Sequence, residues 1–447
     1  MRRCVARQAE AYLIKIFNSQ AKHIKNLAKL QKSKKERNRF FTTLAICLIL
    51  IYNKKSKKQP KKRTFEFCGV LLQKTERKFI MKLICDGLDL SDAINKVGRA
   101  LPSKVINPVL EGIKLTAQDG KLTVFASDTE LSVQRAINAE IIEDGEVLVP
   151  GRFFSDYIKR LTDEQLELFT NEKNQLRIKY SDSEGFVQLL NGGDYPVFKE
   201  PENSQQTVIL QRELKDSIEK TIIAVSDDES RPTLNGCLLE FDGFTLTTVA
   251  LDGYRMAINK KPLEKESQHV KVIVPTRALN EIDRLLGDDE EVAAIKTEEN
   301  LIFVDLGDTK VSSRLINGEF INYNQLLPQD FVTNIVVDTR RLENCLDRAS
   351  LPSRQEKNNL VKFEIKENML TIYGTSEMSN VKENINISLK GKDLNIAFNA
   401  RFIADCLKVI KNEFIKMSFT SSISPSIITP CDTDESTYLV LPVRMVN

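Results

Sequence analysis

The sequence repeats itself three times, at a spacing near 124 residues, from Met81 to the end of the chain. Each copy opens with a stretch in which apolar residues recur three and four apart: "LDLSDAINKVGRALPS", "RELKDSIEKTIIAVS" and "TRRLENCLDRASLPS". That spacing predicts an amphipathic helix. Leu90, Leu214 and Leu342 occupy equivalent places in the three stretches. Units of this size are duplicated domains, because solenoid repeats have periods of roughly 20–50 residues.

Strands and a second helix follow in every copy. Dipeptides typical of tight hairpin turns lie between alternating strands: Asp119-Gly120, Asp242-Gly243 and Glu367-Asn368. The second helix is predicted from "EVLVPGRFFSDYIKRL", "VKVIVPTRALNEIDRLL" and "LNIAFNARFIADCLKVI". Two helices and several short antiparallel strands in each copy predict an α+β fold. We expect three domains at 81–202, 203–329 and 330–447, with polar linkers at 199–207 and 328–334.

Residues 1–80 have a different composition from the rest. They hold 22 Lys and Arg against 4 Asp and Glu, whereas residues 81–447 hold 43 against 58. Their apolar run, "FFTTLAICLILIY", is shorter than the roughly 20 residues that a membrane span needs. Because Met81 looks like a natural protein start, we expect 1–80 to be a basic extension that is disordered or translated from an over-extended start site. The alternatives are an arm that contacts nucleic acid or an anionic membrane surface.

Several kinds of chemistry have little support in the sequence. The eight cysteines include no CxxC, which favours reduced thiols in a cytoplasmic protein over disulfides or a zinc site. His23 and His269 are the only histidines, and neither GxxxxGK[ST] nor GxGxxG occurs. Acidic pairs such as Asp227-Asp228 lie in polar, loop-like runs, where carboxylates are usually solvated. We therefore expect a protein that is not an enzyme and that carries no metal or other cofactor.

Four motifs, taken in order over the three repeats, identify a family. They are "LSDAINKVGRALPSK", "RPTLNG", "VALDGYRMA" and the ending "YLVLPVRM". Together they resemble the bacterial DNA polymerase III beta subunits, the sliding clamps, over residues 81–447. The resemblance implies a DNA polymerase processivity factor: a head-to-tail homodimer whose six domains close a ring around duplex DNA, with helices lining the hole and sheets forming the outer wall.

A ring whose net charge is negative has to concentrate its cations near the DNA. Evenly spread negative charge would repel the duplex, so Lys and Arg should gather on the inner helices. Sliding requires contacts to phosphates without base reading. The resemblance suggests these DNA-facing residues: Arg99, Lys104, Lys215, Lys220, Arg231, Arg341, Arg348 and Arg354. For each residue alone, a solvated helix face is an equal alternative.

Members of the family bind their partners through a short peptide that enters an apolar pocket between domains two and three. The partners implied are the replicative polymerase alpha subunit, the clamp loader, and other polymerases and repair proteins. The corresponding residues here are Leu234, Leu251, Gly253, Tyr254, Arg255, Met256, Ile321, Gln325, Leu326, Pro425, Leu439, Leu441, Pro442, Val443 and Arg444. Tyr254, Gln325 and Ile321 stand where the family often has histidine, arginine and proline, which predicts an altered peptide preference. Taken alone, "LDGYRM" is more typical of a plain strand, turn and strand, and it is the chain end that favours the pocket.

The chain ends in "TYLVLPVRMVN", and its last apolar strand contains a proline. A proline cannot donate to a strand ladder, so this strand should not be a normal central strand. We expect residues 438–440 to finish the sheet of domain three. Pro442 should then end the pairing and turn Leu441, Val443 and Arg444 toward the pocket. Val446 and Asn447 extend slightly past the usual family ending.

Two further expectations concern partners. For the dimer contact, the resemblance suggests Tyr157 and Leu161 of domain one against Leu351 in domain three of a second copy. The alternative function is a generic nucleic-acid-binding protein that acts through its basic N-terminal arm. That alternative predicts that residues 1–80 bind DNA by themselves and that clamp function is lost without them.

Overall fold

The computed structural model describes residues 81–444, with gaps at 103, 105–106, 163, 202–205, 288–289, 299 and 355–358. The predictions for residues 1–80, and those for Val446 and Asn447, concern residues outside this range. Among the residues described, no helix is both long enough and apolar enough to cross a membrane.

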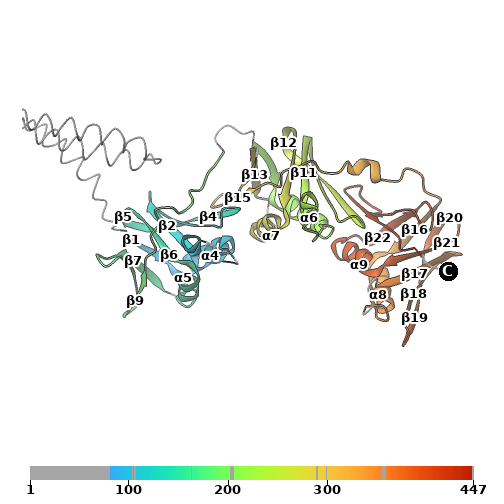
Figure 1. Ribbon diagram of the computed structural model, residues 1–447, viewed down its shortest axis with the longest axis horizontal. Coiled ribbons are helices and arrows are strands. Elements are labelled where there is room, and N and C mark those ends of the chain that lie inside the picture. Colours follow the sequence, from blue (N-terminus) through green and yellow to red (C-terminus); the bar gives the residue numbers. More distant parts are fainter. Residues whose placement is uncertain are drawn as a thin grey trace, which may run out of the picture. The chain divides into compact units, whose positions relative to one another are not determined.

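The described part of domain one contains two α-helices, nine strands and two short 3-10 helices, η1 (Gly98–Ala100) and η2 (Pro108–Glu111) (Figure 1). The α-helices and strands are β1 (Lys82–Asp86), α4 (Gly87–Val97), β2 (Gly112–Gln118), β3 (Lys121–Ser127), β4 (Leu131–Asn138), β5 (Glu140–Glu143), β6 (Gly145–Pro150), α5 (Gly151–Ile158), β7 (Gln165–Thr170), β8 (Gln175–Tyr180) and β9 (Ser183–Gln188). The Asp86 carboxylate caps α4 by accepting hydrogen bonds from the backbone N–H groups of Leu88 and Asp89. Asp119 and Gly120 have φ angles of +54° and +73°, as a two-residue hairpin turn requires, and they join β2 to β3 as predicted.

Domain two repeats this order with longer strands. Its elements are β10 (Gln206–Leu210), α6 (Gln211–Ile222), η3 (Pro232–Leu234), β11 (Gly236–Leu251), β12 (Arg255–Pro275), α7 (Thr276–Leu285), β13 (Val292–Glu298), β14 (Leu301–Asp305), β15 (Thr309–Arg314) and η4 (Tyr323–Leu326). Each half of β11 pairs with the opposite half of β12. The predicted turn at Asp242-Gly243 falls at a register shift within β11, where Gly243 has a φ of +55°.

Domain three has the same plan. Its elements are β16 (Thr333–Asp338), α8 (Thr339–Ser350), β17 (Leu360–Lys366), β18 (Met369–Thr375), β19 (Asn380–Asn386), β20 (Ser388–Gly391), β21 (Leu394–Asn399), α9 (Ala400–Val409), β22 (Phe414–Phe419), β23 (Ser426–Pro430) and β24 (Ser436–Val440). Glu367 and Asn368, with φ angles of +51° and +61°, form the predicted turn between β17 and β18. The Asn399 side chain caps α9 by accepting from the Arg401 N–H.

The two helices of each domain lie side by side on the sheets: α4 with α5, α6 with α7, and α8 with α9 (Figure 1). Their apolar faces form the core. Leu90, Leu214 and Leu342, the equivalent leucines of the three first helices, are all at most 2% exposed. The α+β architecture in three copies is thus as the sequence predicts.

Of the four sheets in the described part of the chain, two continue from one domain into the next. The eight-stranded sheet runs β10-β13-β14-β15-β4-β3-β2-β6, so that β15 of domain two pairs with β4 of domain one. The seven-stranded sheet runs β11-β12-β24-β23-β22-β16-β20, so that β24 of domain three pairs with β12 of domain two. We call the β4–β15 pairing the first junction and the β12–β24 pairing the second junction. Strand pairing across domain boundaries was not predicted from the sequence.

The last strand of each domain is followed by the same backbone hydrogen bond. The N–H of Leu190 donates to the carbonyl of Leu148 over 2.8 Å, and that of Ile316 donates to Ile273 over 2.9 Å. In domain three, the N–H of Val443 donates to the carbonyl of Ala397 over 2.8 Å. The chain end therefore follows the course that residues 189–198 take in domain one and that residues 315–324, the crossing segment, take in domain two.

Candidate functional site

An apolar cluster joins domains two and three on the face of the sheet that is turned away from the helices. Alternation along β12 places Met256 and Ile258 in this cluster and Ala257 in the helix-side core. We call it the interdomain cluster. Its buried members are Leu234, Leu238, Val249, Leu251, Met256, Ile258, Ile273, Tyr323, Ile427 and Leu439, with Ile316, Phe320, Leu327, Phe331 and Leu441 half-buried against them.

Five of the residues expected in the peptide pocket meet in this cluster. Leu234 comes from η3, Leu251 from the end of β11 and Met256 from the start of β12. Leu439 of β24 lies directly opposite Met256 in the ladder, and Leu441 follows it. A shared apolar patch of this kind can seat the aliphatic side chains of a peptide.

The turn between β11 and β12 forms an aromatic rim beside the cluster. Gly253 has a φ of +93°, which disfavours any side chain there. The neighbouring Tyr254 is 62% exposed, and its ring stacks on Phe402 of α9 with centroids 6.1 Å apart and planes 20° apart. Phe402 was not predicted. The sequence indicates it only as an aromatic residue next to Ile403, at a position of the predicted helix that is not centred on the core.

Arg255 has a structural role that the sequence did not suggest. Its side chain is 8% exposed and contacts two carboxylates, Asp252 over 3.0 Å and Asp405 of domain three over 2.7 Å. The guanidinium also lies 4.8 Å from the centroid of the Phe402 ring. Arg255 therefore links the aromatic rim to α9, and its positive charge is balanced by the two carboxylates.

The crossing segment and the turns near it hold the remaining pocket residues. Ile321 and Leu326 are 45% and 44% exposed, so their apolar surface is available to a ligand. Gln325 is exposed on η4, and Pro425 is half-buried just before β23.

The chain end corrects one expectation. β24 does not finish the sheet of domain three but lies inside it, between β23 and β12 of domain two. The strand can be central because it ends at Val440, so that Pro442 falls outside the ladder. The N–H of Leu441 then donates to the carbonyl of Tyr254 over 2.9 Å, and Val443 is drawn to β21 by the bond to Ala397. Pro442 is half-buried and Arg444 is exposed.

Lys261 occupies a buried polar site at the second junction. Its side chain is 6% exposed, and its ammonium contacts Glu213 over 2.9 Å, Asp216 over 2.7 Å and Glu435 of domain three over 2.8 Å. Burial opposes the charge of Lys261, but the three carboxylates together raise its pKa above the usual value. For Asp216 burial again opposes, and the hydrogen bonds from Lys220 and Lys261 outweigh it and lower the carboxyl pKa.

The comparison with known proteins agrees along the whole described range. Models of the N-terminal, central and C-terminal domains of the DNA polymerase III beta subunit match residues 81–199, 208–322 and 324–444. The beta sliding clamp of Staphylococcus epidermidis is 32% identical over 361 residues, which is 78% of this chain and 96% of that protein. The chain belongs to the DNA polymerase III beta subunit family.

Solved structures of sliding clamps have the same fold. The clamp of Bacillus subtilis superposes with a TM-score of 0.79 at 29% identity, covering 82% of this chain and all of that one. The clamp of Pseudomonas aeruginosa bound to griselimycin gives a TM-score of 0.78 at 27% identity, with the same coverage. As a sliding clamp the protein is a processivity factor of the polymerase, and it is not an enzyme. The matched ranges exclude the basic segment 1–80 on which the alternative function depends.

Most of the residues expected to face DNA are engaged with carboxylates. Lys220 is the most buried of these, because its side chain is 13% exposed and lies 2.6 Å from Asp216. The others keep about half of their side-chain surface exposed beside an acid. These pairs are Arg99–Glu281 over 3.7 Å, Arg231–Asp228 over 3.1 Å, Arg348–Glu383 over 2.7 Å, and Arg354–Asp347.

The remaining three candidates differ in exposure. Lys104 and Arg341 are exposed, whereas Lys215 is half-buried on α6. Arg231 also has a second neighbour, since its guanidinium lies 3.4 Å from the position that a Cβ on Gly253 would take. Arg231 therefore borders the peptide rim as well as the first helix of domain two.

The helices of the clamp are much less acidic than its remainder. Together the six described α-helices carry 12 Lys and Arg against 11 Asp and Glu, compared with 43 against 58 for residues 81–447. The surplus of negative charge therefore lies outside these six helices. The helices should therefore repel phosphates less strongly than the rest of the clamp does.

The expected dimer residues do not all reach the surface. Leu161 is 7% exposed and belongs to the core of domain one, so the expectation for Leu161 was wrong. Tyr157 is half-buried, with its hydroxyl donating to the Tyr180 hydroxyl over 3.2 Å. Leu351 is 53% exposed, as an interface residue would be in the single chain. Phe153, which was not among the expected residues, is 57% exposed and stacks on Tyr157.

Proposed function

We propose that two copies of this chain close head to tail into a ring around duplex DNA. In the cytoplasm, the ring tethers the replicative polymerase alpha subunit through a short peptide that binds at the interdomain cluster. The clamp loader, other polymerases and repair proteins would use the same site. The observation that carries the peptide site is the pairing of Met256 with Leu439, which brings apolar side chains of two domains into one patch.

The two junctions inside the chain support the head-to-tail ring. In both, the strand that follows an equivalent turn in one domain, β4 or β12, pairs with the last strand of the next domain, β15 or β24. The same backbone hydrogen bond recurs at this turn in all three domains. The N–H of Asp128 donates to the Leu131 carbonyl, that of Asp252 to the Arg255 carbonyl, and that of Ser376 to the Ser379 carbonyl. The third such strand, β19, is an edge strand of its sheet, and so is β9, the last strand of domain one. An exposed edge strand is a natural pairing surface.

Extending the repeat gives a register for the contact between copies. The first junction pairs Ser132 with Ser312, and the second pairs Met256 with Leu439. The equivalent residues of the open edges are Asn380 on β19 and Phe186 on β9, which is 52% exposed. Lys382 then lies opposite Glu184. We therefore propose β9–β19 pairing for ring closure, with Tyr157 and Leu351 near it.

Contacts to DNA in such a ring would be made to phosphates by exposed cations such as Lys104 and Arg341. Binding of this kind is blind to sequence and weakens steeply with salt, because each contact releases condensed counterions. The paired arginines can exchange a surface carboxylate for a phosphate at little cost, since exposed ion pairs contribute only about 0–1 kcal/mol.

Truncation of the chain end tests the peptide site. Removing Leu441–Asn447 deletes the residues that follow β24 in the cluster, and we expect the affinity for alpha-subunit peptides to fall about tenfold, or roughly 1.4 kcal/mol. Overlapping fluorescent peptides tiled along the alpha subunit would supply the ligands, with binding followed by anisotropy. Removal of Met445–Asn447 alone is the matched control. Unchanged affinity in the longer truncation would overturn the assignment.

A further inference from the structure

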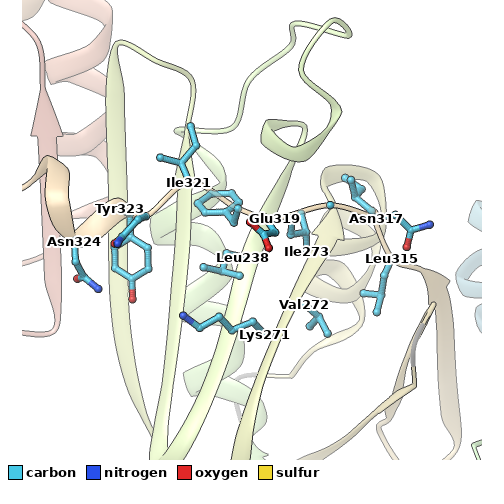
Figure 2. Close-up of a pocket in the computed structure, with 14 residues that line it drawn as sticks. Leu238, Lys271, Val272, Ile273, Leu315, Asn317, Glu319, Ile321, Tyr323 and Asn324 are labelled. Atoms are coloured by element: carbon cyan, nitrogen blue, oxygen red, sulfur yellow. The ribbon is translucent and has the colours of Figure 1, made fainter.

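A cavity of about 710 Å³ opens beside the interdomain cluster, between the crossing segment and strands β11 and β12 (Figure 2). Its floor contains Leu238 and Ile273, which are 3% and 4% exposed. Polar side chains stand around it: Lys271 on β12, and Asn317 and Glu319 on the crossing segment. None of these polar residues belongs to the pocket expected from the sequence.

The walls of the cavity are fixed by contacts within domain two. The Tyr323 hydroxyl donates to one Glu240 oxygen over 2.8 Å, and the Lys271 ammonium lies 2.9 Å from the other. Burial, followed by the hydrogen bond to Glu240, raises the pKa of Tyr323 to about 12, so its hydroxyl remains a donor at neutral pH. On the crossing segment, Gly318 has a φ of +132°, and a Cβ there would come within 2.7 Å of Thr233. Because these contacts already fix the walls, binding of a ligand would cost the site little conformational entropy.

The apolar floor is continuous with the interdomain cluster. Leu238, Ile273 and Tyr323 belong to both. Ile321, an exposed residue of the expected pocket wall, also lines the cavity (Figure 2). A chain seated on the interdomain cluster would therefore reach the cavity by passing Ile321.

At the position of Leu238, the side chain is apolar in domain two alone among the three copies. The residue equivalent to Leu238 in domain one is Lys114, which pairs with Glu146 over 2.8 Å. In domain three it is Lys362, whose ammonium lies 5.8 Å from the centroid of the Tyr373 ring. The fold therefore does not require an apolar residue at this position, and in domain two Leu238 joins the cavity floor to the interdomain cluster.

We infer that this cavity is a second subsite for the partner peptide, occupied by the residues just beyond its aliphatic anchors. One apolar side chain packs against Ile321, which is 45% exposed above the floor of Leu238 and Ile273, and a carbonyl or carboxylate oxygen accepts from Lys271. Lys271 suits this role because it can only donate and because its side chain stays 51% exposed beside Glu240. This inference rests on the proposed peptide site at the interdomain cluster.

The test compares two lengths of the same ligand on the full-length dimer. The alpha-subunit peptide that binds best is trimmed from each end to the shortest core that still binds. We expect the untrimmed peptide to bind about tenfold more tightly than the core. Lys271→Glu and Asn317→Trp, which reverse the donor charge and place a large ring at the cavity, should abolish this gain and leave the affinity of the core unchanged. Lys362→Glu, the same charge change on domain three, should leave the gain intact.

The outcomes separate this inference from the function on which it rests. Binding of the core without any gain from the longer peptide overturns the subsite alone. An equal loss of core and longer peptide in both cavity variants, with the dimer intact by sedimentation, also overturns it. If no alpha-subunit peptide binds the unmodified protein, the peptide site itself fails and the subsite fails with it.

Discussion

The two junctions within the chain have the same geometry and opposite chemistry. On the face away from the helices, the first junction pairs Ser132 with Ser312, and the second pairs Met256 with Leu439. The serine pair leaves a polar seam, with the Ser132 hydroxyl 2.8 Å from that of Ser127. The methionine–leucine pair opens an apolar patch instead. The same strand pairing therefore carries different side chains at the two junctions, and only the second forms part of the interdomain cluster.

The ion pairs at the two junctions differ in burial. At the first junction, Lys310 contacts Glu200 over 3.1 Å with side chains 29% and 42% exposed. At the second, Lys261 is 6% exposed among three carboxylates. Exposed pairs are screened by water and contribute little, whereas a buried charge that loses its partner is costly. The second junction should therefore be the more rigid, which suits a pocket built from two domains.

The largest expected effect comes from Lys261→Met. This change leaves three partly exposed carboxylates without their shared buried cation, and we expect the free energy of unfolding to fall by about 3 kcal/mol. Urea titration with unchanged slope would measure it. Lys310→Met at the first junction is the matched control, with an expected loss below about 1 kcal/mol. Equal losses at the two junctions would contradict the difference in burial.

The next effect concerns the apolar pair itself. Met256→Ser makes the second junction resemble the first, and we expect it to weaken alpha-subunit peptides about a hundredfold, or roughly 2.7 kcal/mol. The lost contact is a methionine side chain that is 2% exposed in the cluster. Ser132→Ala at the first junction should leave the affinity unchanged. An affinity within twofold of the unmodified protein would remove Met256 from the site.

Many helices, turns and pocket residues could be predicted from short stretches of sequence. The helices follow from apolar spacing, and the turns at Asp119-Gly120 and Glu367-Asn368 follow from residues that tolerate positive φ. The apolar pocket residues came from resemblance to the family. Lys220 could have been recognised as paired, because Asp216 lies four residues before it on the same helix.

The two junctions could not be predicted from short stretches of sequence. Met256 and Leu439 are far apart in the sequence, and strand pairing between them leaves no local pattern in either segment. Lys261 lies in the polar run "NKKPLEKESQ", which is typical of a solvated strand edge. Its burial depends on carboxylates from α6 and from domain three. Leu161 was misassigned because the turn that follows α5 directs its side chain into the core, and amino-acid composition does not reveal that turn.

A third junction, between two copies, would extend the comparison. In the proposed β9–β19 register Lys382 faces Glu184, so Glu184→Lys should weaken the dimer about tenfold by placing like charges opposite each other. Adding Lys382→Glu restores opposite charges and should recover most of the affinity. Sedimentation velocity over a dilution series would follow this. If the double variant is as weak as the single one, the register is wrong even if the dimer is real.

The smallest effect is the pH dependence of the second junction. The pKa of Asp216 lies below its usual value of 3.8 in the folded chain, so its contribution to stability is complete above the unfolded value and is lost as pH falls through the folded one. Lys261 has a raised pKa, so its contribution is complete below the usual value of 10.5 and is lost only at higher pH. The difference in unfolding free energy between the unmodified protein and Lys261→Met should therefore be constant from about pH 6 to about pH 9 and shrink below about pH 4. A difference that changes between about pH 6 and about pH 9 would mean that a group titrating near neutrality, outside this network, governs the junction.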